Sequence, residues 1–451
     1  MIRLYNTATR EVTPLKLRDK NKVSIYVCGP TVYGPPHLGH GRHVLVYDVL
    51  RRYLTSQGFD VNFVSNITDI DDNIINKAAA DNTSWTEVVK EYEQQWWDGL
   101  DKLNVMRPDH IPHATDYVDE MVELVAELLA TDNAYLATDG VYIATENVAD
   151  YGLLANQALE NLVEGGGDRE VVGTEKKHPA DFALWKFTKP GEPSWPSPWG
   201  DGRPGWHTEC VVMSLDLLGE GFDLHTGGLD LMFPHHENER AQAVALDKEF
   251  AGHWMHHGFV ELAGEKMSKS IGNVMNVEQL VEKYDPRAYR LLILQSHYRS
   301  PMEVTETTLQ NADVAIKRLD AFVRRSECGD ETSPDPAVME EFAAAMNDDL
   351  NTAKAVDLLF TQVRRANQAV DINASDRANK CAATALAIAQ ILGFEFGDDD
   401  EVPAEIKDLA ERRILARTNK DYAEADSIRD QLTEAGWRVE DSADGPVISQ
   451  L

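Results

Sequence analysis

Cysteine is scarce in this sequence, with four residues among 451. The four (Cys28, Cys210, Cys328 and Cys381) lie far apart and form no CxxC pair, which is typical of a chain kept in a reducing cytoplasm. The first residues lack the basic stretch and apolar run of a secretory signal. No uninterrupted apolar stretch approaches the roughly 18 residues of a membrane span. We therefore expect a cytoplasmic protein with no membrane partner.

Basic residues are also few. Lysine and arginine number 43 against 76 aspartates and glutamates, a formal net charge of −33 at pH 7. A nucleic-acid binder is normally basic on its working face, because phosphate contacts dominate its affinity. Either this protein has no nucleic-acid partner, or it works where charges are screened. At molar salt the Debye length is about 3 Å, and we therefore hypothesise a salt-loaded cytoplasm, as in halophilic organisms.

The first 65 residues predict the fold class. Val23–Cys28 is typical of a buried strand, a helix is expected to begin near His37–Gly41 and to end at Gly58, and Val61–Val64 is the next strand. Strand, helix and strand in this order form a βαβ unit. This implies an α/β fold with a Rossmann-like parallel sheet that binds its ligand at the carboxyl ends of the strands. The stretches 211–218 and 222–226 are expected to return to the sheet.

The rest of the chain predicts further regions, and 451 residues suit two to four domains at roughly 100–200 residues each. In residues 133–151 apolar and polar side chains alternate, as they do in strands. Residues 163–205 are rich in glycine, proline and charged residues. From Thr305 the pattern is helical, and the acidic stretch 397–401 is typical of a linker. The expected regions are 1–115, the first half of the Rossmann-like domain; 116–200, a connective insertion; 201–250, the second half; 251–315, a loop and linking region; 316–397, a helical bundle; and 398–451, a small C-terminal α/β domain.

His37-Leu38-Gly39-His40 stands where the first strand–helix turn becomes a helix. The N-terminus of a helix presents unpaired N–H groups and a positive dipole end, which suit phosphate. Gly39 lets a flat base approach the backbone, and two imidazoles three residues apart share one helix face. Short His-Gly strings also arise by chance, so two ordinary surface histidines are the alternative for this motif alone.

Lys266-Met267-Ser268-Lys269-Ser270 is a second motif, which lies between Gly264 and Gly272. Ammonium groups on such a loop can neutralise the β- and γ-phosphates of a nucleotide while charge builds at the α-phosphorus. A solvated surface loop is the alternative when this stretch is considered alone. The two motifs are about 230 residues apart. In sequence and in order they resemble the two signatures of the class I aminoacyl-tRNA synthetases.

Four longer stretches resemble one family of that class, the cysteinyl-tRNA synthetases. They are YVCGPTVYGPPHLGH (26–40), NITDIDD (66–72), GWHTEC (205–210) and FPHHENE (233–239), in the family's order. The resemblance covers essentially the whole chain and is strong to about residue 300. It implies ATP-dependent activation of L-cysteine and its transfer to the 3′ end of tRNA(Cys). It also implies that 251–315 holds the KMSKS loop and a stem-contact region, and that 398–451 binds the anticodon.

The resemblance further implies one zinc ion per chain in the amino-acid pocket. Matched motif by motif, its ligands are Cys28, Cys210, His235 and Glu239. The spacing agrees, since residues 235 and 239 lie one turn apart on one helix face. Zinc favours a thiolate strongly over a hydroxyl, whereas a hydrophobic pocket separates such near-isosteres by only about 10²-fold. His236 is interpreted as a supporting histidine, and the cysteines at 328 and 381 as small packing residues.

Other site residues follow from the same resemblance. Substrate-binding residues are Gly29, Thr31, Thr68 and Trp206, which closes the pocket; ATP-binding residues are His37, Gly39, His40, Gly228, Asp230 and Lys269; and catalytic residues are His37, His40, Lys266 and Lys269. The two lysines are expected to stabilise the departing pyrophosphate together with Mg²⁺. Ordinary packing is the alternative for any single pocket residue.

Recognition of tRNA is expected in the C-terminal third. The basic candidates are Arg287, Arg290, Arg412, Arg413, Arg417, Lys420 and Arg438, and Trp437 either stacks on an anticodon base or packs in a core. The family is usually monomeric, so we expect a monomer. Two other interpretations stay open: the related cysteine ligase of mycothiol synthesis, which needs no anticodon domain, and a catalytically inactive RNA-binding paralogue, against which the two intact motifs argue.

Overall fold

The structure is a computed structural model that describes residues 2–159, 176–262, 265–266, 275–326, 332–396, 403–442 and 445–450. The chain forms two compact units, Met1–Phe394 and Glu395–Leu451, and each is described by itself. Lys269 and Cys328 lie outside the described residues. No helix in the described part of the chain is long and apolar enough to cross a membrane.

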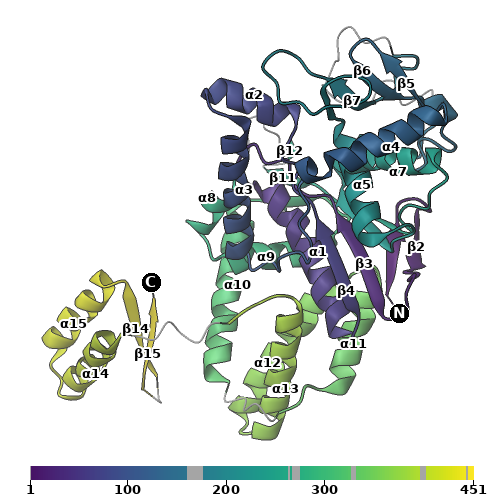
Figure 1. Cartoon of the computed structure of the whole chain (residues 1–451). Coiled ribbons are helices and arrows are strands. Elements are labelled where there is room, and N and C mark those ends of the chain that lie inside the picture. The colour runs from purple at the N-terminus through teal and green to yellow at the C-terminus, as the bar shows by residue number, and fades with distance from the viewer. Residues whose placement is uncertain are drawn as a thin grey trace. The chain divides into compact units, whose positions relative to one another are not determined.

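A four-stranded parallel sheet forms the centre of the first unit, in the order β10–β9–β3–β4 (Figure 1). Its strands are β3 (Lys22–Val27), β4 (Asp60–Ser65), β9 (Leu224–Gly228) and β10 (Trp254–His257). Helix α1 (Leu38–Ser56) connects β3 to β4. The predicted βαβ unit and the Rossmann-like α/β fold are therefore confirmed. A hairpin of β1 (Arg3–Asn6) and β2 (Glu11–Pro14) precedes the sheet.

Helix α1 begins and ends where the sequence predicts. His37 caps it: the His37 Nδ1 accepts from the His40 backbone N–H, and the His40 Nδ1 accepts from that of His37. The last helical residue is Ser56, and Gly58 follows with a φ of 86°. Only glycine adopts that backbone angle without strain, which is why it stops helices so often.

The stretch 211–218 is a helix, so its prediction as a strand is wrong. It belongs to α5 (Trp206–Leu218), of which Thr208–Ser214 is buried throughout. Because apolar side chains cover several faces of a buried helix, the helical period is hidden and a short apolar run looks like a strand. The stretch 222–226 does return to the sheet, as β9.

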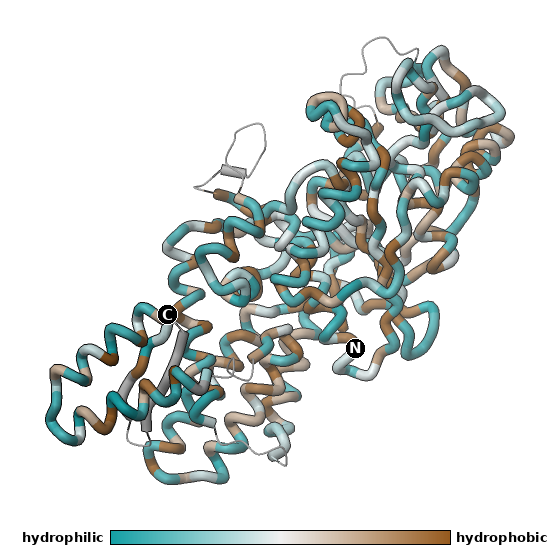
Figure 2. The backbone as a smooth tube through the Cα atoms, turned by 60° about the vertical axis from the view of Figure 1, so that its left-hand side comes forward, coloured by the Kyte–Doolittle hydropathy of each residue, from teal (hydrophilic) through white to brown (hydrophobic). Residues whose placement is uncertain are grey.

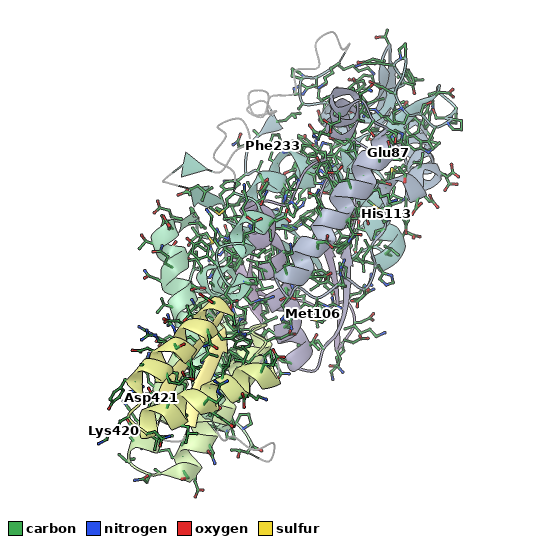
Figure 3. The ribbon with its side chains drawn as sticks, turned by 90° about the vertical axis from the view of Figure 1, so that its left-hand side faces the viewer. Glu87, Met106, His113, Phe233, Lys420 and Asp421 are labelled. Atoms are coloured by element: carbon green, nitrogen blue, oxygen red, sulfur yellow. The ribbon has the colours of Figure 1, made fainter. Side chains whose placement is uncertain are left out.

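Between β4 and β9 the chain forms helices and a second sheet. Helices α2 (Asp72–Asp81) and α3 (Trp85–Lys102) follow β4, and Ser84 and Glu87 form the capping box that begins α3 (Figure 3). Next come η1 (Ala114–Tyr117), α4 (Val118–Ala130) and η2 (Thr145–Asn147). The second sheet is antiparallel, in the order β5–β6–β7–β8, and consists of β5 (Ala134–Ala137), β6 (Gly140–Ile143), β7 (Ala183–Phe187) and β8 (Gly202–Pro204).

After β9 the chain crosses the carboxyl edge of the parallel sheet. The elements there are α6 (Leu229–Leu231), η4 (Met232–His236) and α7 (Glu237–Ala245). After β10, a three-stranded sheet has the order β12–β11–β13, with β11 (Val260–Leu262), β12 (Glu265–Lys266) and β13 (Met302–Val304). Helices α8 (Val277–Val281) and α9 (Pro286–Leu294) lie between β12 and β13 in the sequence.

A helical bundle completes the first unit, as predicted. Its helices are α10 (Glu306–Arg325), α11 (Pro336–Asn347), α12 (Thr352–Asp371) and α13 (Ser375–Ile391). Hydrophobic and hydrophilic segments alternate along them (Figure 2), as expected for helices that bury one face. Cys381 on α13 is half-buried rather than fully buried.

The second unit is small and mixed, as predicted. It contains α14 (Ala404–Thr418), α15 (Tyr422–Glu434) and a hairpin of β14 (Trp437–Ser442) with β15 (Gly445–Gln450). Lys420 and Asp421, labelled in Figure 3, lie in the turn between its two helices. Trp437 packs in the core of this unit with Ile406, Ala410, Ile428, Leu432 and Val439. Of the two interpretations of this tryptophan, packing is therefore the one the structure supports.

Candidate active site

Four potential metal ligands converge at the carboxyl end of β3. Cys28 follows this strand, Cys210 lies on α5, and His235 and Glu239 come from η4 and α7. One ligand atom from each lies within 4.8 Å of all the others, and all four residues are buried. The structure thus brings together the four residues that the sequence predicts as ligands.

The distances within this cluster fit a zinc ion. The two Sγ atoms are 3.8 Å apart, and the Sγ of Cys210 is 3.5 Å from the Nε2 of His235. A tetrahedral zinc with Zn–S bonds of about 2.3 Å holds two sulfurs about 3.8 Å apart, and a sulfur and an imidazole nitrogen about 3.6 Å apart. Burial lowers the pKa of His235 to about 4, so its ring is neutral, which is the form that coordinates metals.

Protons and zinc compete for the same cluster. Burial, and then the neighbouring Cys210, raise the pKa of the Cys28 thiol well above its usual range. Burial also raises the pKa of Cys210. A thiol must lose its proton to bind a metal, and a divalent cation between the two sulfurs supplies the positive charge that favours this loss. The donor set therefore suits a metal better than it suits two protonated thiols.

His225 supports this cluster, and sequence reasoning did not single it out for that role. Its Nε2 lies 2.6 Å from the Oε2 of Glu239, and its ring stacks on Trp254. The Oε1 of Glu239 faces the other way, 3.0 Å from the Nε2 of His235. A side chain that orients a metal ligand in this way usually tunes the affinity of the site. The sequence carried no signal for this contact, because residues 225 and 239 belong to different elements.

His236, predicted as a supporting histidine, is buried and contacts a further histidine. Its Nδ1 lies 2.8 Å from the Nε2 of His256, whose Nδ1 in turn lies 2.7 Å from the Thr7 hydroxyl. Burial lowers the pKa of His256 to about 3, so this ring is neutral. His236 also belongs to a second possible group of ligands, with Cys28, His225 and Glu239. That group shares two members with the first but has only one sulfur.

Trp206 and His207 cover one side of the ligand cluster. The Trp206 ring stacks on His235 with the ring centroids 4.0 Å apart. The Nδ1 of His207 lies 2.8 Å from the Nδ1 of His235 and so fixes the orientation of that ring. Trp206, predicted to close the amino-acid pocket, thus lies directly against one proposed ligand.

Gly29, Thr31 and Thr68 lie on two segments that pair with each other after Cys28 and after β4. Thr31 and Thr68 pair as a short parallel bridge, and the Gly29 N–H donates to the Asn66 Oδ1 over 2.8 Å. A Cβ at position 29 would lie 1.6 Å from the Asn66 carbonyl oxygen, so only glycine fits there. Asn66 stands within the quoted stretch 66–72 but had not been predicted as a site residue.

A buried carboxylate also lies here, from Glu209 on α5. Its Oε2 accepts a hydrogen bond from the Thr68 hydroxyl over 2.9 Å. Burial raises the pKa of Glu209 well above its usual range. Sequence reasoning missed this residue. Glu209 stands within the quoted stretch 205–210, directly before Cys210, but was not singled out there.

The chain that follows the second motif contacts the first motif. The Leu38 N–H donates to the Met275 carbonyl over 3.0 Å, and the Val277 N–H donates to the Pro36 carbonyl over 2.8 Å. Residues 275–277 come five residues after the end of the second motif, which begins with Lys266 on β12. The chain therefore re-enters the described structure beside the first motif. Met267–Ser270 lies outside the described residues.

His37 and His40 are half-buried and stack on each other, with ring centroids 3.6 Å apart. Both Nδ1 atoms accept from backbone N–H groups of the helix cap. A neutral ring with an acceptor Nδ1 carries its proton on Nε2. The two rings therefore present N–H donors at the N-terminus of α1, where an anion is favoured.

Gly228 and Asp230 lie at the end of β9, on the same edge of the sheet. A Cβ at Gly228 would lie 2.3 Å from the Asp230 carboxylate, so a larger residue here would displace that side chain. Asp230 itself is exposed, whereas Gly228 is buried. The preceding Gly227 carbonyl accepts from the Tyr47 hydroxyl over 2.6 Å, which ties this loop to α1.

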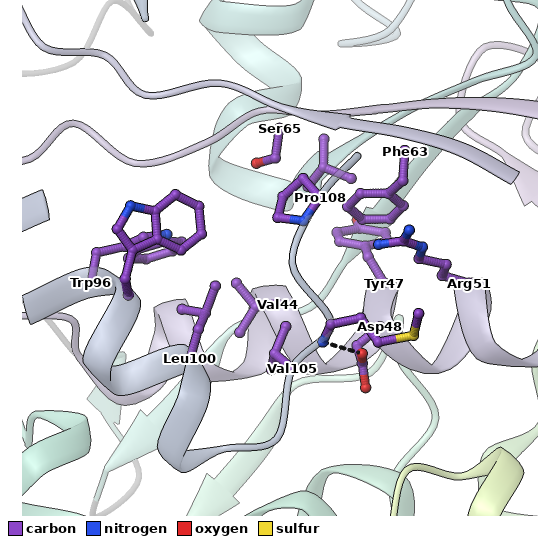
Figure 4. A pocket seen from close by; sticks show the side chains of 13 residues that line it. Val44, Tyr47, Asp48, Arg51, Phe63, Ser65, Trp96, Leu100, Val105 and Pro108 are labelled. Atoms are coloured by element: carbon purple, nitrogen blue, oxygen red, sulfur yellow. Dashed lines mark hydrogen bonds between the residues drawn. The ribbon is translucent and has the colours of Figure 1, made fainter. Parts of the chain in front are cut away.

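A small cavity between α1, β4 and α3 is separate from this site (Figure 4). It is lined mainly by apolar side chains, among them Val44, Phe63 and Leu100, and it contains none of the predicted site residues. Its volume of about 20 Å³ has room for about one water molecule. It is therefore a packing defect rather than a substrate pocket.

The prediction of a tRNA contact is wrong for Arg290. This residue is 1% exposed, and its guanidinium donates to Asp48 over 2.6 Å and to the Leu103 and Asn104 carbonyls. It joins α9 to α1 rather than meeting a partner, and the helix pattern did not indicate which arginine turns inward. Arg287 is paired with Asp285 and Asp320, and Arg413 is buried. Four candidates are exposed: Arg412, Arg417, Lys420 and Arg438.

Comparisons with known proteins agree with this geometry. A family model described as "tRNA synthetases class I (C) catalytic domain" matches residues 14–314, and one described as "DALR domain" matches 341–397. The cysteine–tRNA ligase of Streptomyces avermitilis is 42% identical over 99% of this chain and 98% of its own length. That of Cronobacter sakazakii is also 42% identical, over 99% of each. The Mycobacterium tuberculosis methionyl-tRNA synthetase in complex with methionyl-adenylate has the same fold, with a TM-score of 0.60 at 17% identity over 82% of this chain and 89% of that one.

Proposed function

Because this chain belongs to the cysteine–tRNA ligases, it activates cysteine with ATP and charges tRNA, and we propose how its residues divide that work. The observation that carries the proposal is the buried cluster of two sulfurs, an imidazole and a carboxylate beside Trp206 and Thr68. Cysteine is the amino acid whose side chain such a cluster would select.

Cys28, Cys210, His235 and Glu239 would hold one zinc ion per chain. When bound, zinc coordinates the thiolate of cysteine strongly and the hydroxyl of serine weakly, which separates two substrates of nearly the same shape. Trp206 closes the pocket over His235, and Gly29, Thr31 and Thr68 meet the amino-acid backbone. Selection at this step would make a separate editing site unnecessary.

The ATP site lies at the N-terminus of α1 and the end of β9. His37 and His40 donate to the phosphates, Gly39 and Gly228 leave room for the nucleoside, and Asp230 accepts from the ribose hydroxyls. The cysteine carboxylate attacks the α-phosphorus, and the enzyme mainly positions the reactants and stabilises charge. Lys266 and Lys269 would stabilise the departing pyrophosphate, to which Mg²⁺ would add positive charge when bound with ATP. The 3′-terminal adenosine of the tRNA then attacks the adenylate.

The remaining assignments concern partners and regions. The tRNA is tRNA(Cys), whose anticodon meets the unit after the acidic linker, residues 398–451, with Arg412, Arg417, Lys420 and Arg438 as the exposed basic contacts. Residues 116–200 act as the connective insertion, 251–315 as the loop and stem-contact region, and 316–397 as the bundle. The enzyme works as a monomer in the cytoplasm.

Pyrophosphate exchange with cysteine and with serine tests the proposal directly. Wild-type enzyme should exchange with cysteine and hardly with serine, without tRNA, and should then charge tRNA(Cys) but not an amino-sugar acceptor. Purified enzyme should contain one zinc per chain by metal analysis. Equal exchange with both amino acids, or activity without bound zinc, would contradict the assigned role of the cluster.

A further inference from the structure

Glu209 is a buried carboxylate, and the nearby buried Arg203 forms its ion pairs with Asp72 and Glu192 instead. It is 1% exposed, stands directly before Cys210 on α5 and lies one helical turn after Trp206. Its hydrogen-bond partner is the Thr68 hydroxyl, and among the described residues no lysine, arginine or histidine forms an ion pair with it. A buried charge that lacks a partner is costly to the fold. Packing therefore does not explain why glutamate occupies this position.

The hydrogen bond to Glu209 determines whether the Thr68 hydroxyl can donate or accept a further hydrogen bond. A threonine hydroxyl has one proton to donate and two lone pairs that accept. Thr68 gives that proton to Glu209 over 2.9 Å, and the Asn66 Nδ2 lies 3.3 Å from the same oxygen as a donor. The remaining lone pair can only accept. Whatever meets Thr68 from the pocket must therefore be a hydrogen-bond donor.

The same network places Thr68 beside the proposed zinc ligands. The Asn66 Oδ1 accepts from the Gly29 N–H and lies 3.9 Å from the Sγ of Cys210. In cysteine only two carbon atoms separate the sulfur from the amino nitrogen. A cysteine whose sulfur lies at the ligand cluster can therefore reach Thr68 with its amino group, which is charged and carries only donors.

We propose that Glu209 is a positioning residue that holds Thr68 as an acceptor for the α-ammonium group of cysteine. This rests on the proposed function, since it takes cysteine as the substrate. Selection of the substrate is then divided: the sulfur is recognised by the ligand cluster, and the amino group by the pair of Thr68 and Glu209.

The test compares two ligands that differ only in the amino group. Pyrophosphate exchange gives the KM for cysteine, and competition gives the Ki of 3-mercaptopropionate, which keeps the thiol and the carboxylate but lacks the amine. In Glu209→Gln, the new amide can donate a hydrogen bond to the Thr68 hydroxyl. The hydroxyl proton of Thr68 would then point into the pocket, where it cannot accept from the ammonium group. The KM for cysteine should rise about 10- to 100-fold, the range of one hydrogen bond to a charged group, while the Ki, the KM for ATP and the zinc content stay the same.

Two further variants keep the test decisive. Thr68→Val should show the same selective rise in the KM for cysteine, and it replaces Glu209→Gln in the test if that variant folds poorly. Glu209→Asp keeps a carboxylate, so its KM for cysteine should lie between those of the wild type and Glu209→Gln. Asp181→Asn is a matched control, because Asp181 is equally buried and accepts from the Thr145 hydroxyl over 2.7 Å, away from the pocket. It should leave the ratio of the two constants unchanged.

The outcomes separate this inference from the proposed function. If Glu209→Gln or Thr68→Val weakens cysteine and 3-mercaptopropionate equally, or weakens neither, the positioning role is wrong. If the wild-type enzyme does not exchange pyrophosphate with cysteine at all, it is the proposed function that fails. A selective rise in the cysteine KM with unchanged zinc content supports both.

Discussion

The two ends of the active site are built differently. At the amino-acid end, Cys210, Glu209 and Glu239 are each at most 1% exposed, and each polar group contacts another. At the phosphate end, His37 and His40 are half-buried and Asp230 is exposed. Polar groups in a dry site can discriminate ligands sharply because an unpaired partner is costly there. An open end instead admits a triphosphate and releases pyrophosphate. This difference supports the proposal that the first end selects the substrate and the second end carries the catalysis.

Removing a ligand of the buried end should have the largest effect. Cys210→Ser replaces a sulfur with a poor zinc ligand, so bound zinc should be lost and cysteine activation should fall by more than the roughly 10–100-fold that a merely supporting residue costs. Discrimination against serine should fall with it. Metal analysis and pyrophosphate exchange measure these changes. Cys381→Ser, at a half-buried cysteine of the bundle, is the control; a Cys210→Ser enzyme that keeps its zinc would break the assignment.

Removing a charge from the open end should lower the rate without touching selection. Lys269→Ala should reduce the rate of adenylate formation about 10²- to 10³-fold, as the loss of one group that stabilises transition-state charge does elsewhere. The zinc content and the preference for cysteine over serine should stay constant. Lys283→Ala, at an exposed lysine after α8, should change neither. An unchanged rate in Lys269→Ala would refute the role assigned to this lysine.

A smaller effect should follow from loosening the buried end without removing a ligand. His225→Gln breaks the close contact with the Glu239 Oε2 and should weaken zinc binding about 10- to 100-fold, which competition with a metal chelator measures. Adenylation at saturating zinc should be close to that of the wild type. His253→Gln is the matched control, since His253 is also buried but lies outside both groups of possible metal ligands. Equal zinc affinity in the two variants would show that His225 does not tune the site.

The difference between the two ends also explains what the sequence could predict. The βαβ unit, the start of the helix near His37 and the stop at Gly58 depend on local signals, and the structure confirms them. Cys28, Cys210, His235 and Glu239 were found through the family resemblance alone, since no compact spacing marks them. His225 and Asn66 act across elements that meet only in the fold. Local pattern likewise could not tell that 211–218 is a buried helix or that Arg290 points inward.

The smallest expected effect concerns salt, and it acts on neither end but on the approach of tRNA. Salt has two opposing effects on the binding of tRNA. The net charge of −33 repels RNA at range, and raising the ionic strength from about 0.1 M to about 1 M shortens the Debye length from about 10 Å to about 3 Å and removes that repulsion. The same salt weakens each direct contact between a basic side chain and a phosphate.

If the repulsion dominates, kcat/KM for tRNA charging should rise a few-fold with potassium chloride, while pyrophosphate exchange with cysteine changes little, because both of its substrates are small. The two assays on one preparation separate an effect on tRNA approach from an effect on the folded enzyme. A steady fall of kcat/KM with salt would mean that direct phosphate contacts prevail, and it would count against a salt-loaded cytoplasm. Arg417→Gln sharpens the distinction: losing an exposed basic contact should weaken charging more at low salt than at high salt, and should leave both ends of the active site as they are.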